Sequence, residues 1–183
     1  MKISGRLFLP HILMHFMNII TKFTVATEEG MEAIMMLTQK LAIEKYATLI
    51  EAETLDHFIR DNYNEKTLIS EINSLSNQWL VVYVDNQPAG YARMTSKGIR
   101  PEGLQGKKAI CLADFGVLKA YPDQAIKDSL MEKCLSAGKS YENIWIHEYQ
   151  QNPLLIFFEK KGFLRQQDAP ALYFPLEPVC LIR

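Results

Sequence analysis

The stretch "CLADFGVLKAYPDQAIKDSLMEKCL", residues 111–135, decides the fold because it joins a predicted strand directly to a predicted helix. The strand begins at Ala109 and is mostly apolar up to Val117. The helix that begins near Pro122 carries apolar residues every four positions, and these share one face: Ile126, Leu130 and Cys134. The first turn of such a helix presents backbone N–H groups that suit phosphate. The glycines that usually build a phosphate turn are missing here, so an ordinary crossover helix is the alternative.

The residues before this stretch predict one strand, three helices and a hairpin. A strand over Ile19–Thr27 is rich in β-branched residues, and Thr27 is placed to cap a helix whose first turn carries Glu28 and Glu29. Two shorter helices follow, "ETLDHFIRD" and "EKTLISEINS". The strands "WLVVYV" and "AGYARM" flank the turn "DNQP" and predict a β-hairpin.

The residues after it predict a further strand, a helix and two short strands. The strand is "NIWIHEY", and Asn152, Pro153 and Gly162 are expected at the cap, the first turn and the C′ position of the next helix. The short strands are "GFLRQ" and "ALYFPLE". A hairpin that leads into a β-α-β crossover implies a mixed sheet flanked by helices, so the predicted fold class is α+β.

The composition is that of an ordinary globular domain. The chain has 183 residues and a formal net charge of −1, which favours one domain and argues against electrostatic capture of nucleic acid. The cysteines are Cys111, Cys134 and Cys180, without a CxxC motif or a His/Cys cluster. We therefore expect free thiols, a cytoplasmic location and no metal.

The N-terminal residues 1–18 are expected to form an arm outside the domain of residues 19–183. Their apolar run is interrupted by Pro10, His11 and His15, so it is too short and too broken to span a membrane. A signal peptide is the alternative, but no small-x-small cleavage site follows. Regular patterning begins at Ile19, so translation can begin at Met1 or at Met17.

Three segments resemble the GNAT superfamily of N-acetyltransferases over residues 19–177. "WLVVYVDNQPAGYARM" resembles the hairpin of that family, and "CLADFGVLKAYPDQAIKDSLMEKCL" resembles its cofactor strand and helix. "IWIHEYQQNPLLIFFEKKGFLR" resembles its last strand, helix and turn. The resemblance implies the acyl-CoA N-acyltransferase fold and direct transfer of an acetyl group from acetyl-CoA to an amine.

The resemblance also implies which residues contact acetyl-CoA. The cofactor strand would bind pantetheine through Phe115, Val117 and Leu118, and the cofactor arm would contact Asn152 and Phe158. The pyrophosphate would lie at residues 124–128: Gln124, Ala125, Ile126, Lys127 and Asp128. This turn departs from the family pattern, because Pro122 has no N–H and Lys127 stands where a small residue is usual. The ammonium of Lys127 is the expected substitute for the lost contact, whereas a plain solvated helix start is the alternative.

The acid–base groups depart from the family as well. The family usually places a tyrosine where Phe158 stands, and phenylalanine has no proton to give to the leaving thiolate. Candidate bases are Glu148 and Asp114, because a partly desolvated carboxylate can accept an ammonium proton. The non-catalytic alternatives are that Glu148 faces solvent and that Asp114 makes a hydrogen bond at the strand edge. His147 alternates with Glu148 and is expected on the other side of the strand.

Two functions remain open at this point. The first is an N-acetyltransferase acting on a small-molecule or protein amine, with no nucleic acid or membrane partner and a possible homodimer. In the family the acceptor pocket is usually shaped by the region of residues 46–63, and four acidic residues there would suit a cationic amine: Glu51, Glu53, Asp56 and Asp61. A solvated helical face is the alternative for these residues. The second is a catalytically inactive binding or interaction module of the same fold, because both family signature groups are altered.

Overall fold

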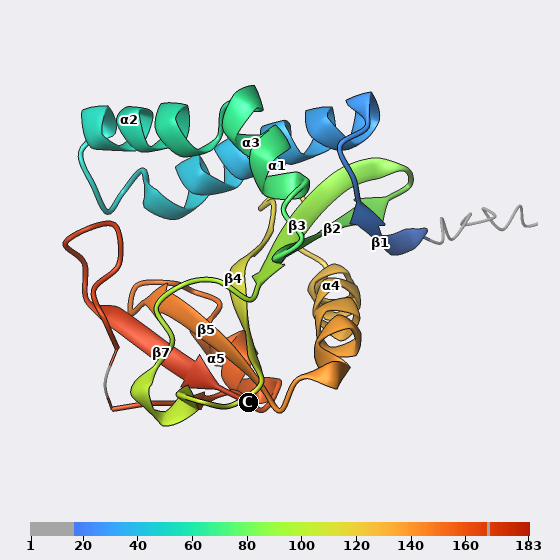
Figure 1. Ribbon diagram of the computed structural model, residues 1–183. Coiled ribbons are helices and arrows are strands. Elements are labelled where there is room, and N and C mark those ends of the chain that lie inside the picture. Colours follow the sequence, from blue (N-terminus) through green and yellow to red (C-terminus); the bar gives the residue numbers. More distant parts are fainter. Residues whose placement is uncertain (1–16, 168) are drawn as a thin grey trace, which may run out of the picture.

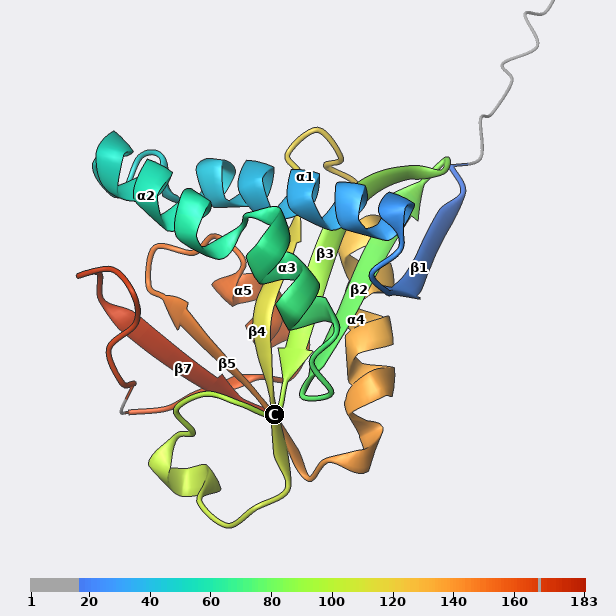
Figure 2. The same ribbon diagram turned by 45° about the horizontal axis from the view of Figure 1, so that its top comes forward.

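The computed structural model describes residues 17–167 and 169–183, which form one mixed sheet covered by helices on both faces (Figures 1 and 2). In these residues the seven strands lie in the order β1-β2-β3-β4-β5-β7-β6, and the β4–β5 pair is the parallel one. The strands are β1 (Ile19–Thr24), β2 (Asn77–Val84), β3 (Gln87–Thr95), β4 (Ala109–Val117), β5 (Asn143–Tyr149), β6 (Leu164–Arg165) and β7 (Pro178–Ile182). The helices are α1 (Glu28–Tyr46), α2 (Ala52–Asn62), α3 (Glu65–Ile72), α4 (Gln124–Ala137) and α5 (Leu155–Lys160). The α+β class and the mixed sheet are confirmed.

Side-chain alternation along the strands divides the core into two layers. Leu80 and Val82 of β2 point to one face and pack with Leu130 of α4 and Phe158 of α5. Trp79, Val81 and Tyr83 point to the other face, where they pack with buried residues of α1 and α3. The sheet therefore carries α1 to α3 on one face and α4 and α5 on the other, as Figure 2 shows.

The helix cap and the hairpin turn in the first half of the chain form as the sequence predicts. The Thr27 hydroxyl accepts a hydrogen bond from the N–H of Gly30, and Glu28 and Glu29 lie in the first turn of α1. The turn between β2 and β3 consists of Asp85 and Asn86, both with positive φ, which is what a two-residue type I′ turn requires. The predicted hairpin is confirmed.

Gly90 allows the close approach of β3 and β4. A Cβ at this position would lie 2.4 Å from the carbonyl oxygen of Gly116 and 2.8 Å from the Cα of Val117. Distances this short leave no room for any side chain, so glycine is required by contact with the neighbouring strand. The apolar–Gly–aromatic pattern of the hairpin is thereby explained.

One strand prediction near the C-terminus is wrong, and α4 and α5 each begin two residues later than Pro122 and Pro153, where their starts were expected. The segment "ALYFPLE" forms a loop, and the strand that follows it is β7. Pro175 lies within this segment and has no N–H to donate to a neighbouring strand. Pro122 lies before α4, and Asp123 is the N-cap. α5 begins at Leu155, after a turn in which the Asn152 side chain accepts a hydrogen bond from the N–H of Leu154. Gly162 follows the C-cap with φ of 88°, as predicted.

The predicted arm lies almost wholly outside the described residues, so its structure is not tested. Met17 packs against the core, and Asn18 exchanges two hydrogen bonds with Asp85. Among the described residues, none of the helices is long and apolar enough to cross a membrane. All three cysteines are buried and free, as expected.

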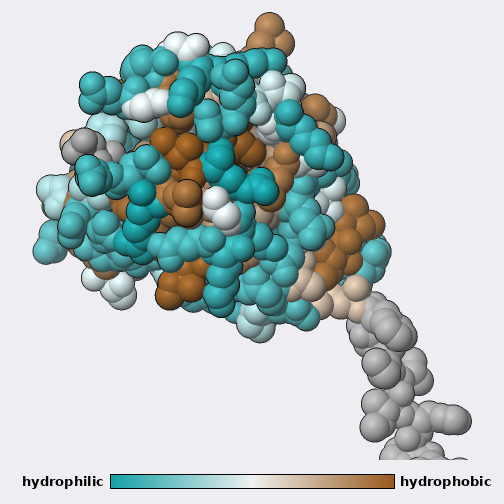
Figure 3. Space-filling view, turned by 90° about the horizontal axis from the view of Figure 1, so that it is seen from below, coloured by the Kyte–Doolittle hydropathy of each residue, from teal (hydrophilic) through white to brown (hydrophobic). Residues whose placement is uncertain are grey.

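β1 forms one edge of the sheet and leaves apolar side chains in contact with solvent. Ile20 is 46% exposed and Phe23 is 50% exposed. Figure 3 shows one group of hydrophobic residues at the side of the molecule that carries β1 and another near the middle of this face, with hydrophilic residues around them. The ammonium of Lys133 lies over the ring of Phe23, 5.3 Å from its centroid, which partly covers this edge.

Candidate functional site

The site begins where β4 and β5 separate. They pair from Ala109 and Asn143 as far as Leu112 and Ile146, whereas β4 stays paired with β3 up to Val117. Figure 2 shows the two strands diverging beyond that point. Within the described part of the chain, the β4 backbone after Leu112 therefore has no strand partner on its β5 side. Such an edge can accept an extended ligand as an added strand.

A β-bulge at Ala113 sets the direction of the next side chain. Arg93 pairs with Asp114 and Met94 pairs with Leu112, so Ala113 is an extra residue in β4. Because of this extra residue, Asp114 shares a sheet face with Arg93 and meets it in an ion pair. Without the bulge, strict alternation would place Asp114 on the α4 face with Leu112.

An open cleft of about 600 Å³ lies along the free edge of β4. Its walls are the end of β4, the C-terminal turns of α1 and the turn after β5. The lining includes Phe115, Gly116, Val117, Leu118, Lys127 and Asn152. The cleft has the volume of a small-molecule site and offers a strand edge along one wall.

A second space, the aromatic cavity, has a volume of about 360 Å³ and lies under α1, α2 and α3. Five of its lining residues form a cluster with ring centroids 4.8–6.2 Å apart: Tyr46, Phe58, Tyr149, Tyr173 and Phe174. The N–H of Phe174 donates to the Tyr149 hydroxyl at 2.6 Å, which ties the loop of residues 172–174 to β5. The loop thus supplies one wall of the cavity.

The open cleft and the aromatic cavity share four lining residues: Lys45, Tyr46, Tyr63 and Asp114. A molecule held in the cleft and one held in the cavity would therefore meet at these side chains. We call this place the junction. It is the position at which a group could pass between two bound molecules.

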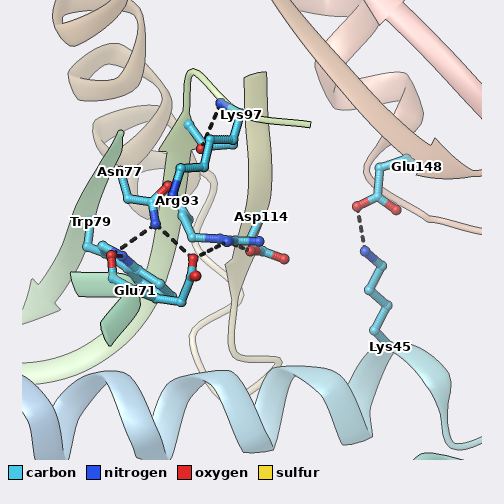
Figure 4. A network of polar contacts seen from close by, with 9 residues as sticks. Lys45, Glu71, Asn77, Trp79, Arg93, Lys97, Asp114 and Glu148 are labelled. Atoms are coloured by element: carbon cyan, nitrogen blue, oxygen red, sulfur yellow. Dashed lines mark hydrogen bonds and ion pairs between the residues drawn. The ribbon is translucent and has the colours of Figure 1, made fainter. Parts of the chain in front are cut away.

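Two sets of ion pairs surround the junction, and Figure 4 shows both. Arg93 donates to Asp114 through Nε at 2.7 Å and to Glu71 through Nη1 at 3.0 Å. The Glu71 carboxylate also accepts a hydrogen bond from Asn77 at 2.7 Å. In the second set Lys45, from the last turn of α1, pairs with Glu148 at the end of β5. Glu148 is buried and also accepts from the N–H of Tyr149.

These contacts fix the protonation of the cations. Burial is the largest single effect on Lys45 and would lower its pKa, but the charge and hydrogen bond of Glu148, together with those of Tyr46, raise that pKa above its ordinary value of 10.5. Burial likewise would lower the pKa of Arg93, but the charge and hydrogen bond of Asp114, together with nearby tyrosines, raise it. Both side chains are therefore cations at neutral pH, with carboxylates already in contact.

The junction tyrosines are neutral. Burial is the largest cause that raises the pKa of Tyr46, to about 12, although nearby Lys45 lowers it. Burial also raises the pKa of Tyr63, and Asp114 adds to the effect. Both hydroxyls keep their protons at neutral pH and can donate hydrogen bonds.

His147 lines the aromatic cavity although the sequence placed it opposite Glu148. Its Nε2 lies 2.6 Å from the carbonyl oxygen of Pro170, and a carbonyl can only accept, so Nε2 carries the proton. Burial lowers the pKa of His147 below its ordinary 6.5, so the ring is neutral at neutral pH. Both His147 and Glu148 reach the cavity, because Glu148 stands at the end of β5 where the strands have separated.

The N-terminus of α4 is capped by the carboxylate of Asp123. The Asp123 carboxylate accepts from the N–H of Ala125 at 2.8 Å, and the Asp123 carbonyl accepts from the N–H of Ile126 at 3.3 Å. These two amides are therefore engaged, and a negative charge already lies at the positive end of the helix. The backbone part of a pyrophosphate cradle does not fit here.

The side chains around this point fit a phosphate better. Lys127 lines the open cleft together with Tyr121 and Pro122. Lys119, in the segment between β4 and α4, lines it as well. The coenzyme A arm therefore fits the free edge of β4, and its phosphates would be held by lysine ammonium groups instead of by glycine amides.

The predicted site residues fall into two groups. Asp114 lies at the junction, Glu148 lies in the aromatic cavity, and the open cleft is lined by Phe115, Val117, Leu118, Lys127 and Asn152. The other predicted residues are not among those that line the cleft: Gln124, Ala125, Ile126, Asp128 and Phe158. Ile126 and Phe158 are buried in the core, and Asp128 pairs with Lys161 at 2.9 Å.

Sequence reasoning missed Lys45, Tyr46, Glu71 and Arg93. Lys45 ends a helix like many surface lysines, so a helical pattern alone gives no reason to select it. The expected acidic residues of α2 lie outside the lining of the cavity, whose carboxylates are Glu71, Asp114 and Glu148. The sequence did contain one feature that could have pointed to the site: Arg93 is a charged residue within a predicted hairpin strand that is otherwise apolar.

Several solved structures with a similar fold are described as acetyltransferases. The PaiA N-acetyltransferase of Thermoplasma acidophilum, in complex with coenzyme A, superposes with a TM-score of 0.73 at 16% identity, over 91% of this chain and 98% of that one. A probable acetyltransferase from Staphylococcus epidermidis matches with a TM-score of 0.64 at 12% identity, over 91% and 98% of the two chains. An acetyltransferase of the GNAT family from Streptococcus pneumoniae matches with a TM-score of 0.60 at 11% identity, over 91% and 99%.

This chain has the GNAT fold. No family model matches the sequence, so the likeness is one of structure. The GNAT-like sheet and the order of its elements agree with the resemblance of the three segments. Among the described residues there is no group of three or more His, Cys, Asp or Glu side chains that could hold a metal ion.

Proposed function

We propose that the protein is an N-acetyltransferase that moves an acetyl group from acetyl-CoA to a primary amine by direct transfer. The observation that carries the proposal is the junction, where a cleft along a free strand edge meets a polar and aromatic cavity. The likeness to solved acetyltransferases, one of them with coenzyme A, supports the same chemistry.

The two compartments would hold the two substrates. The cleft wall of Phe115, Val117 and Leu118 would bind the extended pantetheine arm, and Lys119 and Lys127 would pair with its phosphates. When bound, acetyl-CoA supplies an activated thioester: a C–N bond to the neutral substrate amine forms and the C–S bond breaks. The nitrogen releases one proton as it becomes an amide, and the sulfur takes up one proton. Holding both molecules at the junction provides the proximity and orientation that such a transfer needs.

The side chains of the junction can accept the proton of the ammonium substrate and donate a hydrogen bond to the leaving thiolate. An ammonium substrate must first lose one proton, and Asp114 is the carboxylate that lines both compartments. Lys45 stays an ammonium and supplies positive charge where negative charge develops during the transfer. Tyr46, with a pKa of about 12, keeps its proton and can stabilise the leaving thiolate by a hydrogen bond. Glu148 holds Lys45 in place, which is a positioning role.

The test is titration calorimetry of the purified protein with acetyl-CoA, with Lys127→Glu as the variant. Lys139→Glu is the matched control, because Lys139 is exposed and follows the far end of α4. We expect Lys127→Glu to weaken binding about 10-fold or more, since a hydrogen bond to a charged group contributes about 1.5–3 kcal/mol. Equal affinities of the two variants would reject Lys127 as a phosphate ligand, and absence of binding to the unmodified protein would reject the acetyltransferase.

A second candidate is the inactive module of the same fold. The observation that favours it is Asp123, whose carboxylate occupies the helix start where the family binds pyrophosphate. Release of coenzyme A from acetyl-CoA in the presence of a mixture of amines separates the two functions. Binding of acetyl-CoA without such release would support the inactive module.

A further inference from the structure

We infer that the aromatic cavity selects a small amine that carries one positive charge, one aromatic ring and no carboxylate. The inference rests on the proposed acetyl transfer and names its acceptor class. The chemistry is that of a decarboxylated aromatic amino acid, such as tyramine. Charge balance, the wall of the cavity and its size each support this class.

The charge balance favours a monocation. Three carboxylates line the cavity, from Glu71, Asp114 and Glu148, and they face two cationic side chains, Lys45 and Arg93. His147 adds no charge, because its ring is neutral at neutral pH. The cavity thus holds an excess of one negative charge, which one ammonium group would balance.

The same contacts disfavour a carboxylate on the substrate. Arg93 already donates to Asp114 and Glu71, and Lys45 already pairs with Glu148. Among the described residues that line the cavity, no cation remains without a carboxylate partner. An amino acid would therefore bring its own carboxylate into a partly buried site next to three others, and a buried charge without a partner is strongly disfavoured.

The wall of the cavity favours a ring. Phe58 lies at the centre of the aromatic cluster, with ring centroids 4.8 Å from Tyr173 and 5.0 Å from Phe174. Tyr173 is 63% exposed, so it stands at the rim and can cover a ligand. Aromatic rings prefer edge-to-face and offset contacts of this spacing, and a substrate ring can join the cluster in the same way.

The size of the cavity favours a small molecule. A volume of about 360 Å³ is near the lower end of small-molecule sites. The ammonium of a ring-bearing amine would lie towards Asp114 at the junction, because Asp114 is the carboxylate that lines both the aromatic cavity and the open cleft. A long polyamine would place more than one charge where the excess is a single negative charge.

The experiment compares tyramine, tyrosine and spermidine with the full-length protein. Steady-state rates are measured as thiol release from acetyl-CoA, and tyramine and tyrosine are also titrated into the protein alone. We expect kcat/KM for tyramine to exceed that for tyrosine by about 100-fold or more, since the two differ by the carboxylate that the site cannot pair. Tighter binding of tyramine than of tyrosine to the protein alone is expected as well.

Glu71→Gln provides a change of specificity, with Glu53→Gln as its control. Replacing Glu71 removes one of the two negative charges in contact with Arg93. A substrate carboxylate is then repelled less, so the tyramine-to-tyrosine ratio should fall about 10-fold, mainly through better use of tyrosine. Glu53 has an 89% exposed side chain on α2 and does not line the cavity, so its variant should keep the ratio.

The outcomes separate the two proposals. Preference for tyrosine or spermidine over tyramine overturns the acceptor class and leaves the acetyl transfer in place. If acetyl-CoA neither binds nor reacts, the proposed function fails, and the titrations with the protein alone still decide the cavity. Equal binding of tyramine and tyrosine there overturns the inference.

Discussion

Replacing Lys45 by methionine should destabilise the protein strongly, because it leaves the buried Glu148 carboxylate without its partner. The Glu148 side chain is 6% exposed and that of Lys45 is 24% exposed, so little solvent reaches the pair. Breaking a buried ion pair from one side costs about 3–5 kcal/mol. Because the outer part of Lys45 is near solvent, we expect about 3 kcal/mol, or about 6–12 °C in Tm for a chain of this size.

The assay is urea denaturation of four proteins: the unmodified chain, Lys45→Met, Glu148→Leu and the double variant. If the pair is the cause, the double variant should be more stable than Lys45→Met by about 2 kcal/mol, because no unpaired charge remains. A loss below about 1 kcal/mol for Lys45→Met, or strictly additive effects in the double variant, would refute the reasoning. The m-value should stay constant, which would show that the native fold is kept.

Three further predictions concern the sheet, the helix start and the pH dependence. Gly90→Ala should cost about 3 kcal/mol or more by crowding the Gly116 carbonyl, while Gly103→Ala, where an added Cβ meets nothing within 4 Å, should stay within about 0.5 kcal/mol in the same denaturation assay. Asp123→Ser keeps a capping oxygen and removes a negative charge, so acetyl-CoA should bind about 3-fold more tightly by calorimetry, with stability changed by less than about 0.5 kcal/mol; weaker binding would contradict the assigned role of Asp123. The raised pKa values of Tyr46 and Lys45 mean that the folded chain keeps protons that the unfolded chain releases, so their contribution is complete below about pH 10 and stability falls as the pH rises towards 12. Tyr46→Phe should make that fall shallower, and an unchanged pH profile of this variant would contradict the assignment.

Most of the fold was predictable because its signals are local. Thr27 caps α1, the pair Asp85 and Asn86 turns the hairpin, and Gly162 ends the last helix, and each acts on backbone a few residues away. The wrong secondary-structure predictions concern segments whose conformation depends on contacts with distant parts of the chain. β7 is a strand because β5 and β6 lie beside it, and its sequence differs little from the loop before it.

The candidate site was less predictable because tertiary contacts assemble it. Asp114 and Glu148 could be chosen from their strands, but the partners that set their chemistry come from α1, α3 and β3. Lys45 reaches Glu148 across 103 positions of sequence, and Arg93 reaches Glu71 across 22. A helical period says which face of α1 is buried, but it does not say that the last turn extends beyond the sheet to the junction.

The bulge at Ala113 means that the two halves of β4 follow different counts of side-chain alternation. Exchange of Ala113 for another small residue would keep the register, and Asp114 would still meet Arg93. If β4 kept all its residues but paired regularly with β3, Ala113 would oppose Arg93, and every following side chain would turn to the opposite face. The carboxylate would then point towards α4, and Phe115 would enter the space beside Arg93. Deletion of Ala113 would instead close the bulge and leave Asp114 opposite Arg93, so this strand tolerates a shortening by one residue at the place where it cannot tolerate a straightening.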